Sequence, residues 1–130
     1  MTAVIDTHAL SWHLSRPSRL GKAARALLAK ADAGASTVLI PAIVLVELCL
    51  LRDAGRKVVG IAEIEALLAH QPSFRVVPLD PAQAREFSLL GAVGDPFDRM
   101  IIAAARATGA PLITADTEIE ESKLASIVWD

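Results

Sequence analysis

The sequence predicts an α/β fold in which helices cover both faces of a mainly parallel β-sheet. Short runs of strand-forming residues alternate with helix-forming segments along the whole chain, and no hairpin turn joins two of these runs. Strands that alternate with helices in this way are typical of parallel sheets. The chain has 130 residues, the length of one domain, so we expect residues 1–130 to form a single domain.

Five runs are expected to form the strands. They span residues 3–6, 37–40, 75–79, 112–114 and 127–129. Helices are expected at 23–33, at 42–54, at 61–70, after Asp80-Pro81, and from Asp95-Pro96 to Thr108. In both Asp-Pro pairs the aspartate can cap a helix, and proline suits the first helical position. Ligand sites in such folds gather where the strands end, so the residues after each strand are the first candidates for a functional site.

The composition excludes several classes of protein. Hydrophobic residues make up 53% of the chain, which excludes intrinsic disorder. A net charge of −2 excludes a histone-like binder of nucleic acid. The single cysteine, Cys49, excludes a disulfide framework and a cysteine zinc site, and its leucine neighbours predict an inert buried thiol. No targeting segment or membrane span is visible, so we expect a cytoplasmic protein.

Four of the fifteen acidic residues stand in apolar surroundings. Asp6 and Asp116 follow apolar runs at the ends of predicted strands. Glu47 lies in an apolar helix, where its neighbours three and four positions away are all apolar. Asp98 precedes an apolar turn of its helix. Two strand ends and two helices can bring these four carboxylates together at one edge of the sheet.

Each of these acids also has a purely structural interpretation. Asp6 can cap a short helix that starts at Thr7, and Asp98 can complete a capping box with Asp95. Asp80-Pro81 shows that Asp-Pro alone marks only a helix start, so Asp95 is a cap first and a site residue second.

The two remaining acids have similar alternatives. Asp116 can be a turn residue, and Glu47 can pair with a distant arginine.

The four acids together nevertheless indicate a cation site. Like charges ~5 Å apart repel by about 3 kcal/mol at an effective dielectric of 20, and a domain is stable by only ~5–15 kcal/mol. A cluster of carboxylates must therefore take up protons or bind cations. Oxygen ligands without histidine or cysteine suit Mg²⁺ or Mn²⁺, which activate water for phosphodiester hydrolysis.

These residues occur in a motif order that resembles a known family. The motifs are Ile5-Asp6-Thr7-His8-Ala9-Leu10, an apolar helix with Glu47, Asp95-Pro96-Phe97-Asp98-Arg99, and Thr114-Ala115-Asp116. Together they resemble a PIN-domain ribonuclease, and more narrowly the VapC-type toxins of bacterial toxin–antitoxin pairs. The resemblance covers essentially the whole chain, and the Asp-Pro-Phe-Asp-Arg run is its most specific part. The family often has serine or threonine shortly before the helical glutamate, where this chain has Pro41 to Val44.

The resemblance implies a three-layer α/β/α sandwich and a Mg²⁺- or Mn²⁺-dependent endoribonuclease. It implies four metal ligands, Asp6, Glu47, Asp98 and Asp116. It also implies supporting roles for Asp95 and for the hydroxyls of Thr7 and Thr114. The implied partners are an RNA substrate, a second copy of the chain in a homodimer, and a cognate antitoxin with a segment in the active-site groove. A mean hydropathy of +0.45 agrees with partner-covered apolar surface.

Basic residues provide candidate substrate contacts. Arg52, Arg56 and Lys57 follow the Glu47 helix, and a second group follows the first short helix. That second group consists of Arg16, Arg19 and Lys22. Both groups can contact phosphates or simply be solvated helix ends. Arg99 adjoins Asp98 and can orient a carboxylate or a scissile phosphate, with structural pairing as its alternative.

Other function classes receive less support from the sequence. A receiver-type signalling domain has a similar size, but it needs adjacent acids after the first strand, where this chain has Asp6 followed by Thr7 and His8. A catalytically silent PIN-like binding module remains the second alternative. The three histidines have no serine or cysteine motif beside them, which argues against nucleophilic catalysis. Trp12 is interpreted as a core or dimer-contact residue.

Overall fold

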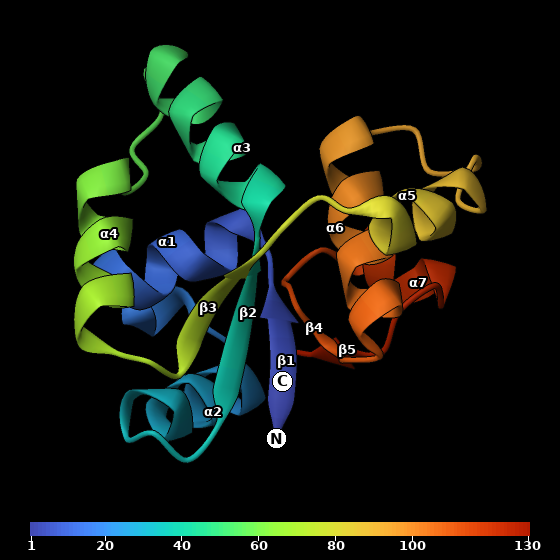
Figure 1. Ribbon diagram of the computed structural model, residues 1–130. Coiled ribbons are helices and arrows are strands. Elements are labelled where there is room, and N and C mark those ends of the chain that lie inside the picture. The colour runs from blue at the N-terminus through green and yellow to red at the C-terminus, as the bar shows by residue number, and fades with distance from the viewer.

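The computed structural model describes residues 1–130, and five parallel strands form its centre. In chain order they are β1 (Thr2–Ile5), β2 (Thr37–Pro41), β3 (Phe74–Val77), β4 (Leu112–Ile113) and β5 (Ile127–Val128). Their order in the sheet is β3-β2-β1-β4-β5, and every neighbouring pair is parallel. All five strands therefore end at the same edge of the sheet, at the top of Figure 1.

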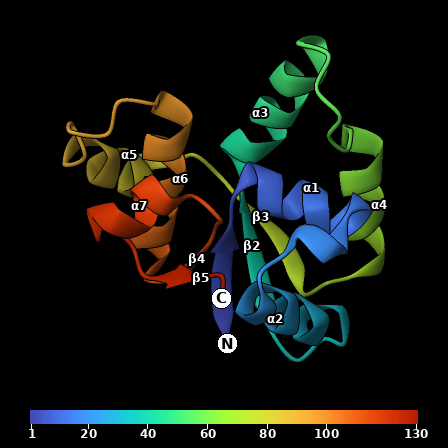
Figure 2. The ribbon, with the colours of Figure 1, turned by 180° about the vertical axis from the view of Figure 1, so that it is seen from behind.

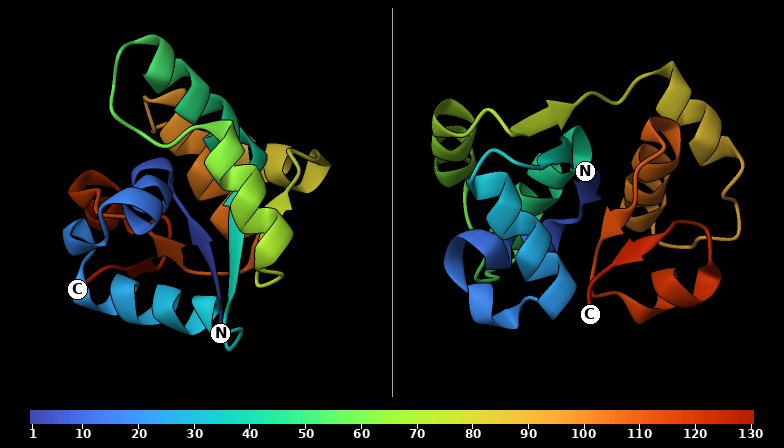
Figure 3. Two further views of the ribbon diagram at one scale, coloured as in Figure 1. Left: turned by 90° about the vertical axis from the view of Figure 1, so that its left-hand side faces the viewer. Right: turned by 90° about the horizontal axis from the view of Figure 1, so that it is seen from below.

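The chain forms seven α-helices. They are α1 (Thr7–Ser15), α2 (Lys22–Asp32), α3 (Ala42–Asp53), α4 (Ile61–His70), α5 (Pro81–Ser88), α6 (Pro96–Thr108) and α7 (Thr117–Ser122). Six of the seven cover the two faces of the sheet, and α3 extends beyond the end of β2 (Figure 1). Figure 3 shows α1, α2 and α4 on one side of the strands, with α5 to α7 on the other. The view from behind in Figure 2 shows the same division. The predicted α/β/α sandwich with a parallel sheet is confirmed. None of the helices has the length and apolar character needed to cross a membrane.

One hydrophobic cluster fills the space between the layers. The strand β1 contributes three completely buried side chains, Ala3, Val4 and Ile5. On α6 the buried positions 103–105 are all alanine, and such short side chains let this helix approach the sheet closely. Because β1 is the middle strand, the residues that follow it emerge at the centre of the molecule.

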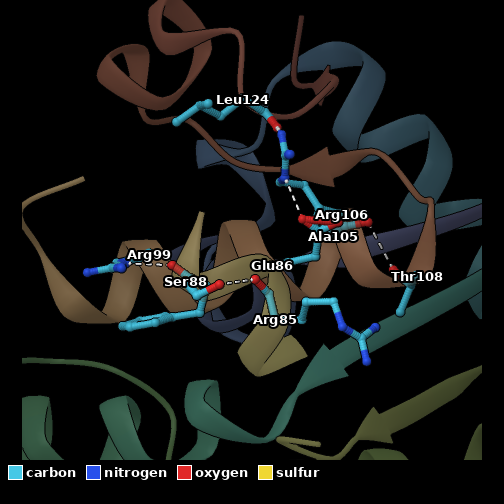
Figure 4. A network of polar contacts seen from close by, with 9 residues as sticks. Arg85, Glu86, Ser88, Arg99, Ala105, Arg106, Thr108 and Leu124 are labelled. Atoms are coloured by element: carbon cyan, nitrogen blue, oxygen red, sulfur yellow. Dashed lines mark hydrogen bonds and ion pairs between the residues drawn. The ribbon is translucent and has the colours of Figure 1, made fainter. Parts of the chain in front are cut away.

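Polar contacts join α6 to α5 and to the segment that follows α7. Arg106 Nε donates to Glu86 Oε2 (3.2 Å), and its Nη1 donates to the carbonyl of Leu124 (3.1 Å). Arg99 Nε donates to the carbonyl of Phe87 (3.0 Å), and its guanidinium lies over the Phe87 ring. Figure 4 shows this network around Glu86, Arg99 and Arg106. It fixes α6 and therefore the acids at its N-terminus.

The clearest differences between the predictions and the structure concern the third strand, a seventh helix and Cys49, and the other bounds differ by no more than two residues. The third strand ends at Val77, two residues before the predicted end. The short helix α7 was not predicted, because its acidic sequence looked like a solvated stretch. Cys49 is exposed, which corrects the prediction of a buried thiol. The helix α3 buries only the face that carries Val44 and Leu48, and Cys49 lies on the opposite face.

Candidate active site

The ends of β1 and β4 bring two of the predicted acids together. Ile5 pairs with Ile113 in the parallel register, so Asp6 and Thr114, which directly follow the two strands, lie side by side. The buried hydroxyl of Thr114 donates to Asp6 Oδ2. The same hydroxyl oxygen accepts a hydrogen bond from the backbone N–H of Asp116 (3.1 Å). Thr114 therefore connects the two aspartates that follow neighbouring strands, as a supporting residue would.

Three of the aspartates begin helices. Asp6 Oδ1 accepts from the backbone N–H of Ala9 (2.9 Å) and caps α1. Asp95 Oδ1 caps α6 and Asp116 Oδ1 caps α7, each by accepting two backbone N–H groups. The second oxygen of Asp95 and of Asp116 has no hydrogen-bond partner in the chain. The capping alternatives considered for Asp6 and Asp95 are therefore correct, but capping uses only part of each carboxylate.

Glu47 and Asp98 reach the same place from two helices. Glu47 lies on α3 between buried Val44 and Leu48, and its Oε1 accepts a hydrogen bond from the buried hydroxyl of Thr7. Asp98 lies in the first turn of α6 and forms neither the capping box nor any other side-chain hydrogen bond, so both of its oxygens are free.

These side chains line a common hollow of about 500 Å³, which we call the acidic cavity. Five carboxylates lie in its wall: Asp6, Glu47, Asp95, Asp98 and Asp116. The rest of the lining consists of Thr7, His8, Trp12, Arg56, Ile101 and Ala115. The four predicted ligands come from segments as much as 110 residues apart, and the fold gathers all of them.

The electrostatics of the cavity follow from this crowding. Desolvation by burial, together with the negative charges of Asp95, Asp116, Glu47 and Asp6, raises the pKa of Asp98 to about 7. Burial likewise raises the pKa of Asp6 to about 6, although the hydrogen bonds from Thr114 and Ala9 oppose the shift. Both carboxyl groups thus titrate near neutral pH. A divalent cation would remove the repulsion that disfavours their ionised forms.

The donor set suits a hard cation. Free carboxylate oxygens surround the cavity, and neither cysteine nor an imidazole that could favour zinc lies among the predicted ligands. No three of the acidic, histidine or cysteine side chains are close enough to form a complete metal cage by themselves. An ion at this place would therefore draw the carboxylates inward or share its coordination with water, as Mg²⁺ commonly does.

The predicted site residues Arg99, Arg52 and Lys57 lie outside the acidic cavity. Arg99 contacts Phe87 on α5 and does not line the acidic cavity, so its contacts in this structure are those of the structural alternative. Among the candidate substrate contacts, Arg56 lies in the cavity wall. Arg52 and Lys57 line a neighbouring hollow. Arg19 lies over the Trp12 ring, 5.0 Å from its centroid.

Two residues of the cavity wall were not predicted from the sequence. His8 and Trp12 occupy successive turns of α1, and their rings lie 5.9 Å apart. The positive charge that His8 can carry opposes the rise in the pKa of Asp6. The four-residue spacing that places both rings on one face of α1, directly after Asp6, is the pattern that could have revealed them.

Comparison with known proteins agrees with this architecture. The profile of the PIN domain family matches residues 3–123, whereas no curated protein matches the chain significantly. A VapBC2 structure from Rickettsia felis, bound to a DNA fragment from the promoter, aligns over 100% of both chains with a TM-score of 0.72 and 16% identity. FitAcB from Neisseria gonorrhoeae aligns over 97% of this chain and 96% of its own with a TM-score of 0.66 and 19% identity.

A toxin–antitoxin complex from Klebsiella pneumoniae is also similar. It aligns over 97% of this chain and 95% of its own, with a TM-score of 0.63 and 20% identity. At these identities the three structures establish the fold alone. The family profile, in contrast, covers most of the sequence and includes each strand end and helix that contributes to the acidic cavity. The chain therefore belongs to the PIN domain family.

Proposed function

We propose that the protein is a Mg²⁺- or Mn²⁺-dependent endoribonuclease and the toxin of a type II toxin–antitoxin pair. The observation that carries this proposal is the acidic cavity, in which five carboxylates from distant segments share one hollow. Such an arrangement is costly unless cations neutralise it. A divalent ion held there would activate water and stabilise the charge that develops on a phosphodiester.

The residues of the acidic cavity have two proposed roles, as ligands of the ion and as residues that orient those ligands. Asp6, Glu47, Asp98 and Asp116 would hold the ion through their carboxylate oxygens. Thr7 orients Glu47, and Thr114 orients Asp6 while it fixes the backbone of Asp116. Asp95 holds the first turn of α6 and thereby fixes the direction in which Asp98 points.

The comparisons and the surface also support partners for the proposed toxin. The similar structures include toxin–antitoxin complexes, which supports a cognate antitoxin for this chain. On α3, Val46 and Leu50 are about half exposed, and Cys49 beside them is exposed. Such an apolar strip is typical of a face that a partner covers, and we propose a homodimer contact there. The cytoplasm is the compartment where such a toxin would meet its RNA substrates.

The proposal is tested with purified protein and a mixed RNA substrate. RNA should be cut internally when Mg²⁺ or Mn²⁺ is present, and EDTA should stop the cleavage. Sequencing the new RNA ends then identifies the target. RNA that stays intact with both ions would reject the nuclease. If Mn²⁺ also fails to change the thermal stability, the silent binding module becomes the better description.

A further inference from the structure

A second hollow, which we call the basic pocket, adjoins the acidic cavity. It has a volume of about 530 Å³ and is formed by the end of α1, the end of α3 and the segment that joins α3 to α4. Four cationic side chains line it: Arg16, Arg52, Arg56 and Lys57. Arg56 lines the acidic cavity as well, so the two hollows share a wall.

The backbone of the basic pocket is held in one conformation by several hydrogen bonds. Gly55 adopts φ +80°, which ends α3 in a left-handed residue. The N–H of Arg56 donates to the carbonyl of Leu51, and the N–H of Gly55 to that of Arg52 (both 2.9 Å). These two bonds form the Schellman motif of a helix end. The position of Arg56 is therefore set by the fold.

The segment after Arg56 is anchored to both neighbouring helices. Val59 N–H donates to Ser11 Oγ on α1 (3.1 Å), and Arg52 Nη1 on α3 donates to the carbonyl of Val58 (2.8 Å). Lys57 directly precedes these two anchored residues. A backbone held in this way loses little conformational entropy when the pocket binds a ligand.

The positive charge of the basic pocket is not neutralised within the chain. The ion pairs of the structure are His13–Asp32 and Arg106–Glu86, and neither involves a pocket cation. One acid, Glu63, lines the pocket, and its Oε2 accepts from the N–H of Gly60 (3.0 Å). A chain with a net charge of −2 thus gathers four cations and one acid in one pocket with no ion pair among them, and the excess positive charge attracts an anion.

We propose that the basic pocket binds the RNA backbone through its phosphates and feeds the strand past Arg56 into the acidic cavity. This inference rests on the proposed function, because it names the part of the surface that holds the substrate. Arginine presents a planar fork that matches phosphate oxygens, and several cations along one hollow match the repeated charges of a strand. Arg56 then contacts the phosphate nearest the carboxylates.

The lining of the basic pocket favours RNA over an acidic protein segment. Val58 and Val59 are its two apolar residues, and no aromatic side chain lines it. Protein interfaces have apolar and aromatic residues at their centre, whereas phosphate contacts are made by exposed basic and polar groups. The lining of the basic pocket is therefore that of a phosphate-binding surface.

The test measures binding of a single-stranded oligoribonucleotide in EDTA, where cleavage is blocked. We compare the wild type with the double variant Arg16→Ala/Lys57→Ala over a series of salt concentrations. Neither side chain makes a hydrogen bond in the protein, so the fold should be kept. The double variant should bind at least about tenfold more weakly. The slope of log K against log[salt] should become shallower by about 1.4, since each phosphate contact on a single strand contributes ~0.7.

The matched control is Arg75→Ala/Arg85→Ala, which removes the same charge from exposed positions on β3 and α5. Its affinity should stay within about twofold of the wild type. An equal loss in both double variants would show that only the overall charge matters and would overturn the proposal. So would tighter binding of an oligoglutamate peptide that depends on Arg16 and Lys57.

The binding test and the cleavage test can contradict the two proposals independently. If RNA binding depends on the basic pocket but no cleavage occurs at any ion concentration, the proposed RNA site is supported and the proposed nuclease activity is rejected. If the Arg16→Ala/Lys57→Ala variant cleaves RNA with an unchanged KM, the nuclease activity is supported and the role of the basic pocket in RNA binding is rejected.

Discussion

The helices α5 and α6 begin in the same way, but only α6 contributes to the acidic cavity. Asp80-Pro81 and Asp95-Pro96 both place a capping aspartate before a proline at the first helical position. Two residues after each proline, α5 has Gln83 and α6 has Asp98. Gln83 is buried and donates to the carbonyl of Met100 (3.2 Å), whereas Asp98 faces the cavity with no hydrogen-bond partner.

The difference between the two helix starts shows what a capping motif does and does not determine. The motif fixes where a helix begins, because the aspartate accepts its first N–H groups. The functional role depends on what the N-terminus faces. For α6 it faces the ends of β1 and β4, where other carboxylates already lie. For α5 the equivalent position packs against a neighbouring helix.

The largest expected effect separates Asp98 from Asp80. Replacing Asp98 by Asn removes a proposed ligand from the cavity at almost constant volume. We expect RNA cleavage to fall by about 10³-fold, the rate equivalent of several kcal/mol of lost charge stabilisation. Asp80→Asn is the control and should keep nearly full activity. Equal activities of the two variants, measured as initial cleavage rates with Mn²⁺, would contradict the assignment of the site.

The second effect is the response of stability to a divalent ion. Binding of Mn²⁺ to the folded state alone should stabilise the wild type by about 2.7 kcal/mol at 100 times the Kd, which corresponds to a rise in Tm of several degrees. Asp80→Asn should respond like the wild type, and Asp98→Asn much less. Thermal unfolding with and without Mn²⁺ measures the difference. A similar rise in both variants would mean that the ion binds elsewhere.

The third effect is the dependence of stability on pH without metal. In the folded protein the pKa of Asp98 is raised to about 7 and that of Asp6 to about 6, mainly by burial. Between pH 4 and 7 the folded state therefore binds more protons than the unfolded state, and stability falls as the pH rises. In EDTA, Asp98→Asn should flatten this fall, whereas Asp80→Asn should not. An unchanged pH profile in Asp98→Asn would show that the carboxyl ionises normally.

The smallest expected effect is the loss of stability when the capping side chain of Asp80 or Asp95 is removed. Asp80→Ala and Asp95→Ala should each cost about 1 kcal/mol of unfolding free energy, because each removes a side chain that caps a helix. Only Asp95→Ala should also slow cleavage, since it loosens the turn that carries Asp98. Chemical denaturation and initial rates measure the two quantities. If both variants slow cleavage equally, the loss follows from stability and not from position.

The sequence was sufficient to predict those site residues whose position follows from the strand or helix next to them in the chain. Asp6 directly follows β1 and Asp116 comes three residues after the end of β4, and parallel strands end at one edge, so their proximity followed from the pattern. Glu47 was conspicuous because its helical neighbours are apolar. Their roles as metal ligands stay predictions until an ion is bound.

Other features depend on packing that no local pattern encodes. The hydrogen bond from Thr7 to Glu47 joins residues 40 positions apart and depends on how α3 leaves the sheet. Arg99 turns away from Asp98 because the carbonyl and ring of Phe87 offer it a better partner. The exposure of Cys49 follows from the single face that α3 buries. Such outcomes are decided by neighbouring helices and not by neighbouring residues.

The ring of Trp12 in the cavity wall has a practical consequence. The protein contains two tryptophans and no tyrosine, and the second, Trp129, lies 6.0 Å from the first between ring centroids. Ultraviolet emission of the unlabelled protein therefore comes from one pair of indoles, of which one borders the carboxylates. Titration of an ion or an oligonucleotide can thus be followed by tryptophan fluorescence, without a dye that would compete for the acidic cavity.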